Sequence, residues 1–369
     1  MSSSFFDLCP DLLLQLFEYF SLNELFDVFI EIIPCLSNFL NESHMRLCID
    51  RNATEDFWNQ ILPKINSNQI LSINHSHIIP DLSIYSSLQS IHLNLQSSFI
   101  FHQFQSLIHL KQLSIQLSEN IIEDEIWLSS ILTLPTLKTL KIDLNIPKLI
   151  LIPQRSISID RPAHQSNTIE CLHMKVPISC QSHLNFLQHF PNLKIFRALL
   201  CQLDPPPPPS IINPPFLPSL QTLDLRGYIP NMSSMIDVIS SSMPNLKYCR
   251  LVAMNVTNDN AFRMRSASIW KNLFKHCSDL IQVKIHLIMS IEVNDNFNNH
   301  EIKDLIREFN NNSFCEKYSF QMEQRSTNRG YITFTGNYQN KKKKNESIIR
   351  YSIDNRKHSF DNHKVEYGN

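Results

Sequence analysis

The chain has 369 residues, with 33 lysines and arginines against 34 aspartates and glutamates, and a formal net charge of −1 at pH 7. This balance gives no charge-based reason to expect binding to nucleic acid or to a membrane surface, so neither partner is expected. The four glycines are too few for the glycine-rich loops that hold phosphates in nucleotide-using enzymes. The nine cysteines include no C-x-x-C pair, which indicates reduced thiols in an intracellular protein.

The N-terminal segment predicts two short helices. Proline suits the first position of a helix, where a missing N–H costs nothing, so the first helix is expected to begin at Pro10. Its apolar face recurs at helical spacing and comprises Leu13, Leu16, Phe17 and Phe20. Ser21 and Glu24 have the spacing of a capping box that starts a second helix. The expected apolar side of that helix comprises Leu25, Val28, Phe29 and Ile32. Helices this apolar need a partner, or the rest of the chain, to cover them.

A short phrase, L-x-x-L-x-L with conservative changes, recurs about nine times between residues 68 and 285. Its last two apolar positions are two residues apart, so both point to the same face of a strand. The nine copies end on the pairs Leu71/Ile73, Ile91/Leu93, Leu113/Ile115, Leu140/Ile142, Leu172/Met174, Phe196/Ala198, Leu223/Leu225, Cys249/Leu251 and Val283/Ile285. Such a chain is expected to stack one strand-containing unit on the next, because no unit can bury its apolar face alone.

Helices are expected between the copies. Proline disfavours helix in the residue before it, and four copies carry a proline two residues ahead of their first leucine: Pro135, Pro191, Pro218 and Pro244. Apolar residues at helical spacing predict helices at Glu123–Thr133, Gln181–Phe190, Ser233–Ser242 and Asp259–His276. The predicted fold class is therefore α/β with parallel strands. A doubly wound sheet is the alternative, although that fold needs longer apolar strands.

The recurring phrase resembles the leucine-rich-repeat family. The resemblance implies a solenoid with parallel strands on its concave face and helices outside. The family often places Asn or Cys three residues after the last apolar position, and only Asn145 and Cys201 fit that position here.

The N-terminal helices resemble an F-box, the module that binds the Skp-type linker subunit of a cullin–RING ubiquitin ligase. The residues that match, and that the resemblance implies would bind the linker, are Leu8, Pro10, Leu13, Leu16, Phe17, Tyr19, Phe20 and Leu25. Two departures stand out. Cys9 separates Leu8 from Pro10, and Pro34 interrupts the segment where the family has a Val-x-x-x-Trp helix. The alternative is a helical hairpin that only caps the first repeat.

These patterns divide the chain into four parts. They are a small all-α F-box-like module at 1–50, a connecting helix at 51–67, a solenoid at 68–310 with a proline-rich insertion at 204–218, and a polar Lys/Asn-rich tail at 311–369. Within the last two parts, Glu301–Phe309 predicts a helix and Tyr331–Thr335 a strand. The expected location is the cytoplasm, or the nucleus if the lysine run Lys341–Lys344 acts as an import signal.

The solenoid also predicts a binding face. The residue between the two final apolar positions of each copy must point away from the core. In chain order these residues are Ser72, His92, Ser114, Lys141, His173, Arg197, Asp224, Arg250 and Lys284. The same face two residues further on carries Asp143, Lys175, Arg226 and His286. The candidate target-binding residues are Lys141, His173, Lys175, Arg197, Arg226, Arg250 and Lys284. Arginine forks suit the oxyanions of an acidic or phosphorylated peptide; a solvated strand face is the alternative.

The expected function is substrate recognition for an SCF-type cullin–RING ubiquitin ligase, with the helical module on the linker and the repeats on an unknown target protein. The first alternative is a repeat scaffold that binds proteins with no role in ubiquitin transfer. The second is an unrecognised α/β enzyme. The sequence has neither H-E-x-x-H nor a nucleophile elbow, and the pair His75 and His77 has no acidic or Cys partner nearby. We therefore expect no catalytic residue, no cofactor and no metal site.

Overall fold

The computed structural model of the protein describes residues 10–29, 46–75, 81–95, 98–117, 130–144, 166–178, 186–200, 216–228, 232–254, 267–290, 307, 321–326 and 331–339. The expected helix Glu301–Phe309 lies almost wholly outside these ranges, as do the proline-rich insertion and the lysine run.

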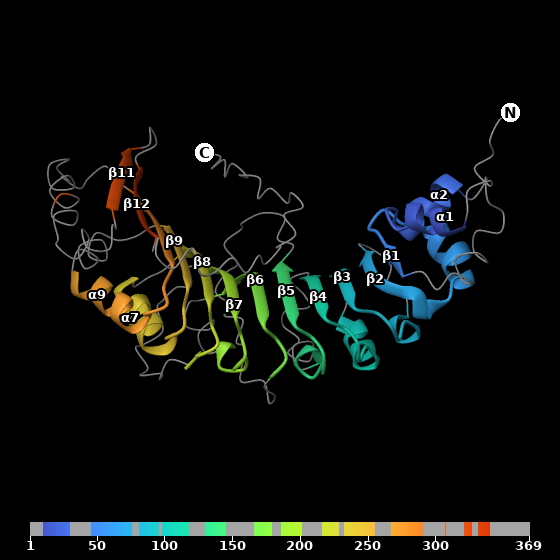
Figure 1. The fold of residues 1–369 in the computed structure, drawn as a ribbon, viewed down its shortest axis with the longest axis horizontal. Helices are drawn as coiled ribbons and strands as arrows, with labels where there is room; N and C mark the ends of the chain where they lie inside the picture. Colours follow the sequence, from blue (N-terminus) through green and yellow to red (C-terminus); the bar gives the residue numbers. More distant parts are fainter. Residues whose placement is uncertain are drawn as a thin grey trace.

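One curved sheet runs through the molecule, and its strands follow one another in chain order from β1 to β10 (Figure 1). The first ten strands pair in parallel, each beside its predecessor. They are β1 (Leu47–Ile49), β2 (Ile70–His75), β3 (Ser90–Leu95), β4 (Gln112–Leu117), β5 (Thr139–Leu144), β6 (Cys171–Ile178), β7 (Ile195–Leu200), β8 (Thr222–Tyr228), β9 (Tyr248–Met254) and β10 (Gln282–Ser290). The predicted α/β class with parallel strands is confirmed, and the arrangement is that of a solenoid. A doubly wound sheet would reverse its strand order part-way, which these ten strands do not do.

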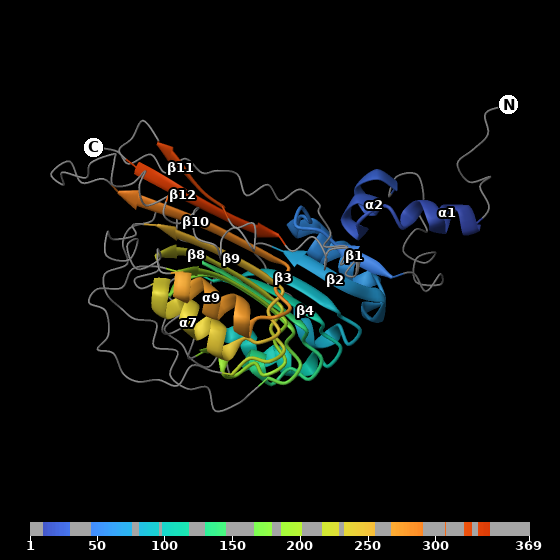
Figure 2. The ribbon, with the colours of Figure 1, turned by 60° about the vertical axis from the view of Figure 1, so that its left-hand side comes forward.

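Helices α7 and α9 and the short turns between strands lie on the outer side of the curve, while α1 and α2 lie at its N-terminal end, beside β1 (Figures 1 and 2). The helices are α1 (Pro10–Phe17), α2 (Leu22–Phe29), α7 (Met232–Ser242) and α9 (Ala267–His276). Shorter turns are the π-helix η2 (Phe57–Ile61) and the 3-10 helices η3 (Leu62–Lys64), η4 (Ser67–Gln69), η5 (Leu82–Ile84) and η6 (Ser98–Ser106). The expected helix Ser233–Ser242 is confirmed as α7, and the described part of Asp259–His276 is α9. The segment 51–67, expected to be one helix, is instead broken into η2, η3 and the start of η4.

Three buried columns of apolar side chains hold the sheet to its helices. The first leucine of each phrase forms one column, and the two strand positions form the others. The register explains this, because strand partners such as Leu113, Leu140 and Leu172 lie directly opposite one another. All three are buried. Truncating one such leucine to alanine typically costs about 2–5 kcal/mol of stability.

The first copy of the phrase is out of register with the prediction. Ile73 pairs with Ile91, so the outward residue opposite His92 is Asn74. Ser72 instead pairs with Ser90, one outward position earlier. The assignment of Ser72 as the equivalent of His92 was therefore wrong by two residues, which keeps the residue on the same face but moves it along the strand.

Each end of the parallel sheet carries an element that the leucine phrase did not predict. At one end β1 falls inside the segment assigned to the helical module. At the other end β12 (Tyr331–Gln339) pairs antiparallel with β10, and β11 (Gln321–Ser326) pairs antiparallel with β12. These two strands lie in the expected polar tail, and β12 includes and extends the predicted strand Tyr331–Thr335.

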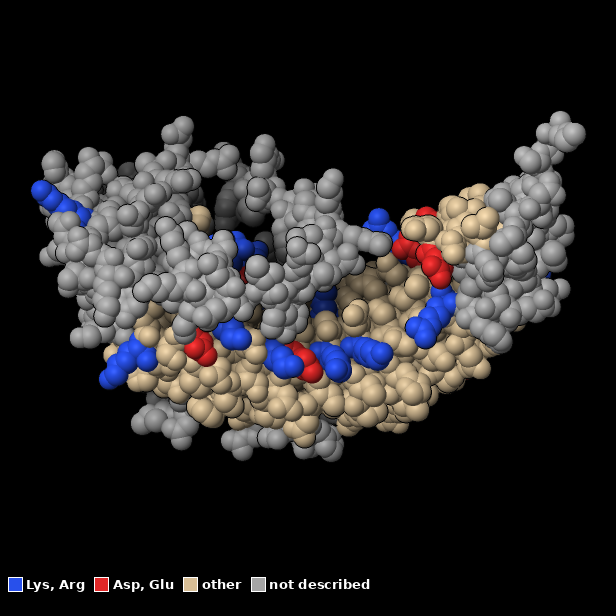
Figure 3. All heavy atoms as spheres, viewed as in Figure 1, with Lys and Arg blue, Asp and Glu red and all other residues tan. Residues whose placement is uncertain are grey.

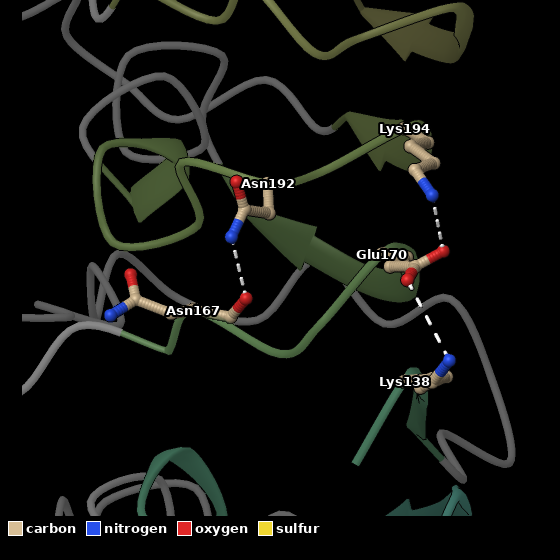
Figure 4. A network of polar contacts seen from close by, with 5 residues as sticks. All are labelled: Lys138, Asn167, Glu170, Asn192 and Lys194. Atoms are coloured by element: carbon tan, nitrogen blue, oxygen red, sulfur yellow. Dashed lines mark hydrogen bonds and ion pairs between the residues drawn. The ribbon is translucent and has the colours of Figure 1, made fainter. Parts of the chain in front are cut away.

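Side-chain hydrogen bonds tie successive repeats together at the turn before each strand. The Asn192 amide donates to the Asn167 carbonyl at 2.7 Å (Figure 4). Asn245 makes the equivalent bond to the Pro218 carbonyl at 2.7 Å. Thr136 donates to the Ile108 carbonyl, also at 2.7 Å. Each donor immediately precedes the first leucine of its phrase, so the polar links between repeats occur here. The expected positions Asn145 and Cys201 lie outside the described residues.

Candidate functional site

The helical hairpin α1–α2 packs against the β1 end of the sheet. The rings of Phe17 and Phe29 lie 5.2 Å apart, and those of Phe26 and Phe57 lie 6.3 Å apart. Asn23 is buried, and its Oδ1 accepts a hydrogen bond from the Asp50 backbone N–H at 3.0 Å. One apolar core therefore runs from the hairpin into the repeats.

This packing buries some of the residues predicted to bind a linker subunit and leaves others exposed. Leu13, Phe17 and Leu25 are buried, while Leu16 and Phe20 are partly buried against the same core. Tyr19 is 87% exposed. Pro10 begins α1 as predicted, and Leu8 lies outside the described residues.

Two further apolar residues of the hairpin face solvent. Leu12 is 51% exposed and Val28 is 52% exposed. Sequence reasoning missed Leu12 and placed Val28 on the apolar side of the second helix, which needs a partner or the repeats to cover it. The inward face of that helix comprises Leu22, Leu25 and Phe29, which leaves Val28 outside the contact with the repeats.

The capping box of the second helix is confirmed. The Ser21 backbone N–H and hydroxyl both donate to Glu24 Oε2, at 2.8 and 2.7 Å. The Glu24 backbone N–H approaches Ser21 Oγ at 3.4 Å. The hydrogen bonds from Ser21 hold the pKa of the Glu24 carboxyl below its usual range, so the cap is formed by the charged carboxylate.

Three of the predicted target-binding residues lie side by side at the centre of the outward sheet face. Lys141, His173 and Arg197 occupy directly opposed positions on β5, β6 and β7. Burial, together with the neighbouring Arg197 and Lys141, lowers the pKa of His173 to about 4. Burial also lowers the pKa of Lys141. At neutral pH this centre therefore carries two cations around an uncharged imidazole.

Other predicted residues are already paired with carboxylates. Lys175 Nζ lies 3.0 Å from Asp143 Oδ2 on the neighbouring strand. Arg226 forms two hydrogen bonds with Asp224, which is nearly buried. Among the described residues, no carboxylate lies within 4.0 Å of the cationic groups of Lys141 or Arg197. Arg250 and Lys284, on β9 and β10, are exposed.

Cys171 and His173 form the contact that most resembles catalytic chemistry. Cys171 Sγ lies 3.3 Å from His173 Nε2. A reactive cysteine needs a low pKa, commonly stabilised by a protonated histidine. Here burial raises the pKa of the Cys171 thiol to about 11 and lowers that of His173 to about 4. Both groups are neutral at physiological pH, so the pair is a poor nucleophile.

A second row of charge lies where the strands begin, and sequence reasoning missed it. We call it the strand-start row: Gln89, Lys111, Lys138, Glu170, Lys194, Gln221, Lys247 and Ile281. Each residue follows the first leucine of its phrase. From Lys111 onward, each backbone N–H donates to the carbonyl of the preceding member at 2.8–2.9 Å. Figure 3 shows basic side chains in a line along this border, interrupted by acidic ones. The recurring dipeptide Leu-Lys was the available signal.

Glu170 neutralises the middle of the strand-start row. Its carboxylate lies 2.7 Å from Lys194 Nζ and 3.9 Å from Lys138 Nζ (Figure 4). All three side chains are more than a third exposed, so these ion pairs contribute little to stability. They reduce the net positive charge at the centre of the row.

The described ranges also bear on metal and membrane sites. There, no three His, Cys, Asp or Glu side chains come together as a metal site would require. No helix in the same ranges combines the length and hydropathy needed to cross a bilayer. Comparison with known proteins finds no match to any protein-family model and none to a curated protein sequence.

Proposed function

We propose that the protein is a substrate-recognition adaptor of a cullin–RING ubiquitin ligase, built as a leucine-rich-repeat solenoid with an F-box-like hairpin. The hairpin binds the Skp-type linker, and the outward sheet face binds the target protein. The catalytic steps are left to other subunits, so this chain contributes proximity and orientation.

The observation that carries the proposal is the apolar surface of the hairpin. Leu12, Tyr19 and Val28 are each at least half exposed, although the same hairpin buries Phe17 and Leu25 against the repeats. A helical cap needs only its inward face to be apolar. Large exposed apolar residues concentrated in one short segment favour a protein partner on the outer face.

A repeat scaffold without a role in ubiquitin transfer is the second candidate. It is favoured by the continuity of the core, since Phe26 and Phe29 pack into the same cluster as Leu47 and Ile49 of β1. A capping role alone would be enough to explain why the hairpin is so well integrated into the core. The two candidates differ in one property, which is affinity for a Skp-type linker.

Linker binding is tested with the full chain co-expressed with a Skp-type subunit. The variant Leu12→Asp/Tyr19→Asp/Val28→Asp changes only exposed side chains, so it should fold. It should lose at least about tenfold in linker affinity, because apolar contacts of this kind dominate such interfaces. A change at Phe17 would be a poor test, because Phe17 is buried and its loss would unfold the hairpin.

The chain offers a matched control for this experiment. Ile84 and Ile108 are both 53% exposed but lie in the repeats. The variant Ile84→Asp/Ile108→Asp should bind the linker as the native chain does. If the native chain does not bind, the adaptor role fails and the scaffold remains. If the hairpin variant binds unchanged, the linker uses another surface.

A further inference from the structure

We infer that a cavity at the N-terminal end of the strand-start row is a binding site for a phosphoryl group. The cavity has a volume of about 460 Å³. It lies where β1, η4 and the starts of β3 and β4 meet. Its walls are Arg46, Asn66, Asn68, Gln69, Leu71, Ser87, Gln89, His109 and Lys111. This site is separate from the residues proposed above for linker and target binding.

The charge of the cavity is one-sided. Among the described residues, its lining contains two permanent cations, Arg46 and Lys111, together with His109, and no carboxylate. Both cations are exposed, so they can reach a ligand without leaving a buried position. The contrast with the centre of the same row is clear, because there Glu170 pairs with Lys138 and Lys194. As far as the described residues go, an anion would meet positive charge with no neighbouring carboxylate in the cavity, and positive charge paired with Glu170 further along.

The hydrogen bonds within the cavity leave it rich in donors. Lys111 Nζ donates to Gln89 Oε1 at 3.0 Å. The Ser86 hydroxyl donates to Asn68 Oδ1 at 2.6 Å. Each of these amide oxygens thus accepts a bond from within the protein, and each amide also carries an NH2 group, which can donate to a ligand. The bond that Lys111 donates to Gln89 also holds the Lys111 side chain in place, which lowers the entropy lost when a ligand binds.

The placement of these donors favours phosphate over carboxylate. Arg46 precedes β1, Asn68 lies on η4, Gln89 precedes β3, and Lys111 lies next to it at the start of β4. These donors therefore come from four separate segments of the chain. A tetrahedral phosphoryl group with three terminal oxygens and a charge near −2 can accept from all of them, whereas a carboxylate offers two oxygens in one plane. Arginine adds a planar fork for two phosphate oxygens.

The experiment titrates the purified full chain, without any linker subunit, with inorganic phosphate at constant ionic strength. Binding is followed by calorimetry or by phosphorus NMR line broadening. Saturable binding is expected, and Arg46→Gln/Lys111→Gln should weaken it by about tenfold or more, since each change removes a charge-assisted hydrogen bond. The matched control is Lys194→Gln, which alters the same row beyond the cavity and should leave phosphate binding unchanged.

Two sources of the phosphoryl group are separated by a second titration. A short phosphoserine peptide that binds at least about tenfold more tightly than inorganic phosphate identifies a modified protein segment, and equal or weaker binding identifies a small phosphate ester. Circular dichroism confirms that each variant is folded. The inference is overturned if phosphate does not bind the native chain, or if both variants bind it equally. Neither outcome depends on whether the hairpin binds a linker.

Discussion

Arg226 donates from Nε to Asp224 Oδ1 at 2.9 Å and from Nη2 to Asp224 Oδ2 at 2.8 Å, so the two residues form a bidentate ion pair along one strand, β8. The Asp224 side chain is only 11% exposed, and that of Arg226 is 32% exposed. These hydrogen bonds to Asp224 raise the pKa of Arg226 above its ordinary value. The Arg226 guanidinium is therefore already bound to the Asp224 carboxylate, and a ligand would have to compete with that carboxylate for it.

This pairing makes Arg226 a stabilising residue. Arg226→Ala should cost about 2 kcal/mol in the free energy of unfolding, because it leaves a nearly buried carboxylate without its partner. The double variant Asp224→Leu/Arg226→Leu should be much closer to the native chain, since it leaves no charge behind. Urea unfolding of the three proteins measures both differences. Equal losses in the single and double variants would show that packing, not the unpaired charge, sets the cost.

His173 predicts a pH dependence of stability. Its pKa is about 4 in the folded chain, against about 6.5 in the unfolded chain. Between these values the unfolded chain binds a proton that the folded chain does not. Stability due to this group is therefore fully present above pH 6.5 and declines as the pH falls towards 4. Across this pH window the loss in the free energy of unfolding amounts to roughly 3 kcal/mol.

The variant His173→Gln should remove this part of the slope between pH 6.5 and 4, measured by urea unfolding at several pH values. His109→Gln, at an exposed position, is the control and should keep the native slope. The groups acting on His173 besides burial are Arg197, Lys141, Lys175 and Asp224, and only Asp224 raises its pKa. An unchanged slope in His173→Gln would mean that other groups account for the acid sensitivity.

Gly227 occupies a position that excludes any side chain. Its φ is +116°, and a Cβ there would lie 2.0 Å from the Leu200 carbonyl oxygen on β7. Gly227→Ala should therefore destabilise the chain by about 2–5 kcal/mol through backbone strain and overlap. Its neighbour at the same register on β9 is Ala253, and Ala253→Gly should cost only about 1 kcal/mol. Thermal unfolding compares the two, and a smaller loss in Gly227→Ala would contradict the close approach.

Much of the sheet could be predicted because the phrase repeats a strong local pattern. Leucines two residues apart must share one face of a strand, so columns such as Leu113, Leu140 and Leu172 follow directly. Strand β1 was not predicted because its copy of the phrase has His44 in the position of the first leucine. The two-residue error that put Ser72 in the place of Asn74 also comes from a weak copy of the phrase. That first copy contains apolar residues at several positions, so its alignment with the later copies could not be fixed from the sequence.

The binding surfaces were harder to predict because they depend on neighbours across strands. Lys175 and Asp143 are 32 positions apart in the numbering, yet the register brings them into an ion pair. The sequence of one strand shows the cation, but it does not show that a carboxylate on the neighbouring strand pairs with it. The cavity was beyond prediction for a further reason. Arg46 forms part of its wall only because β1 joins the sheet, and β1 itself was not predicted.

The bond between Asn23 and Asp50 provides a test of how firmly the hairpin is attached. Asn23→Leu keeps the size of this buried side chain but leaves the Asp50 N–H without its acceptor. The cost should be about 1–3 kcal/mol. If the hairpin opens locally, that cost corresponds to amide hydrogen exchange in α1, α2 and β1 that is about 5- to 150-fold faster than in the native chain.

Asn192→Leu is the matched control, since it removes an asparagine hydrogen bond of 2.7 Å between later repeats. It should speed exchange around β6 and β7 while leaving the hairpin as it was. A hairpin that exchanges at the native rate in Asn23→Leu would be held by its aromatic contacts alone. Because Asn23 joins the hairpin to the residue that follows β1, faster exchange confined to the hairpin and β1 would mean that this segment opens as a unit, separately from the rest of the sheet.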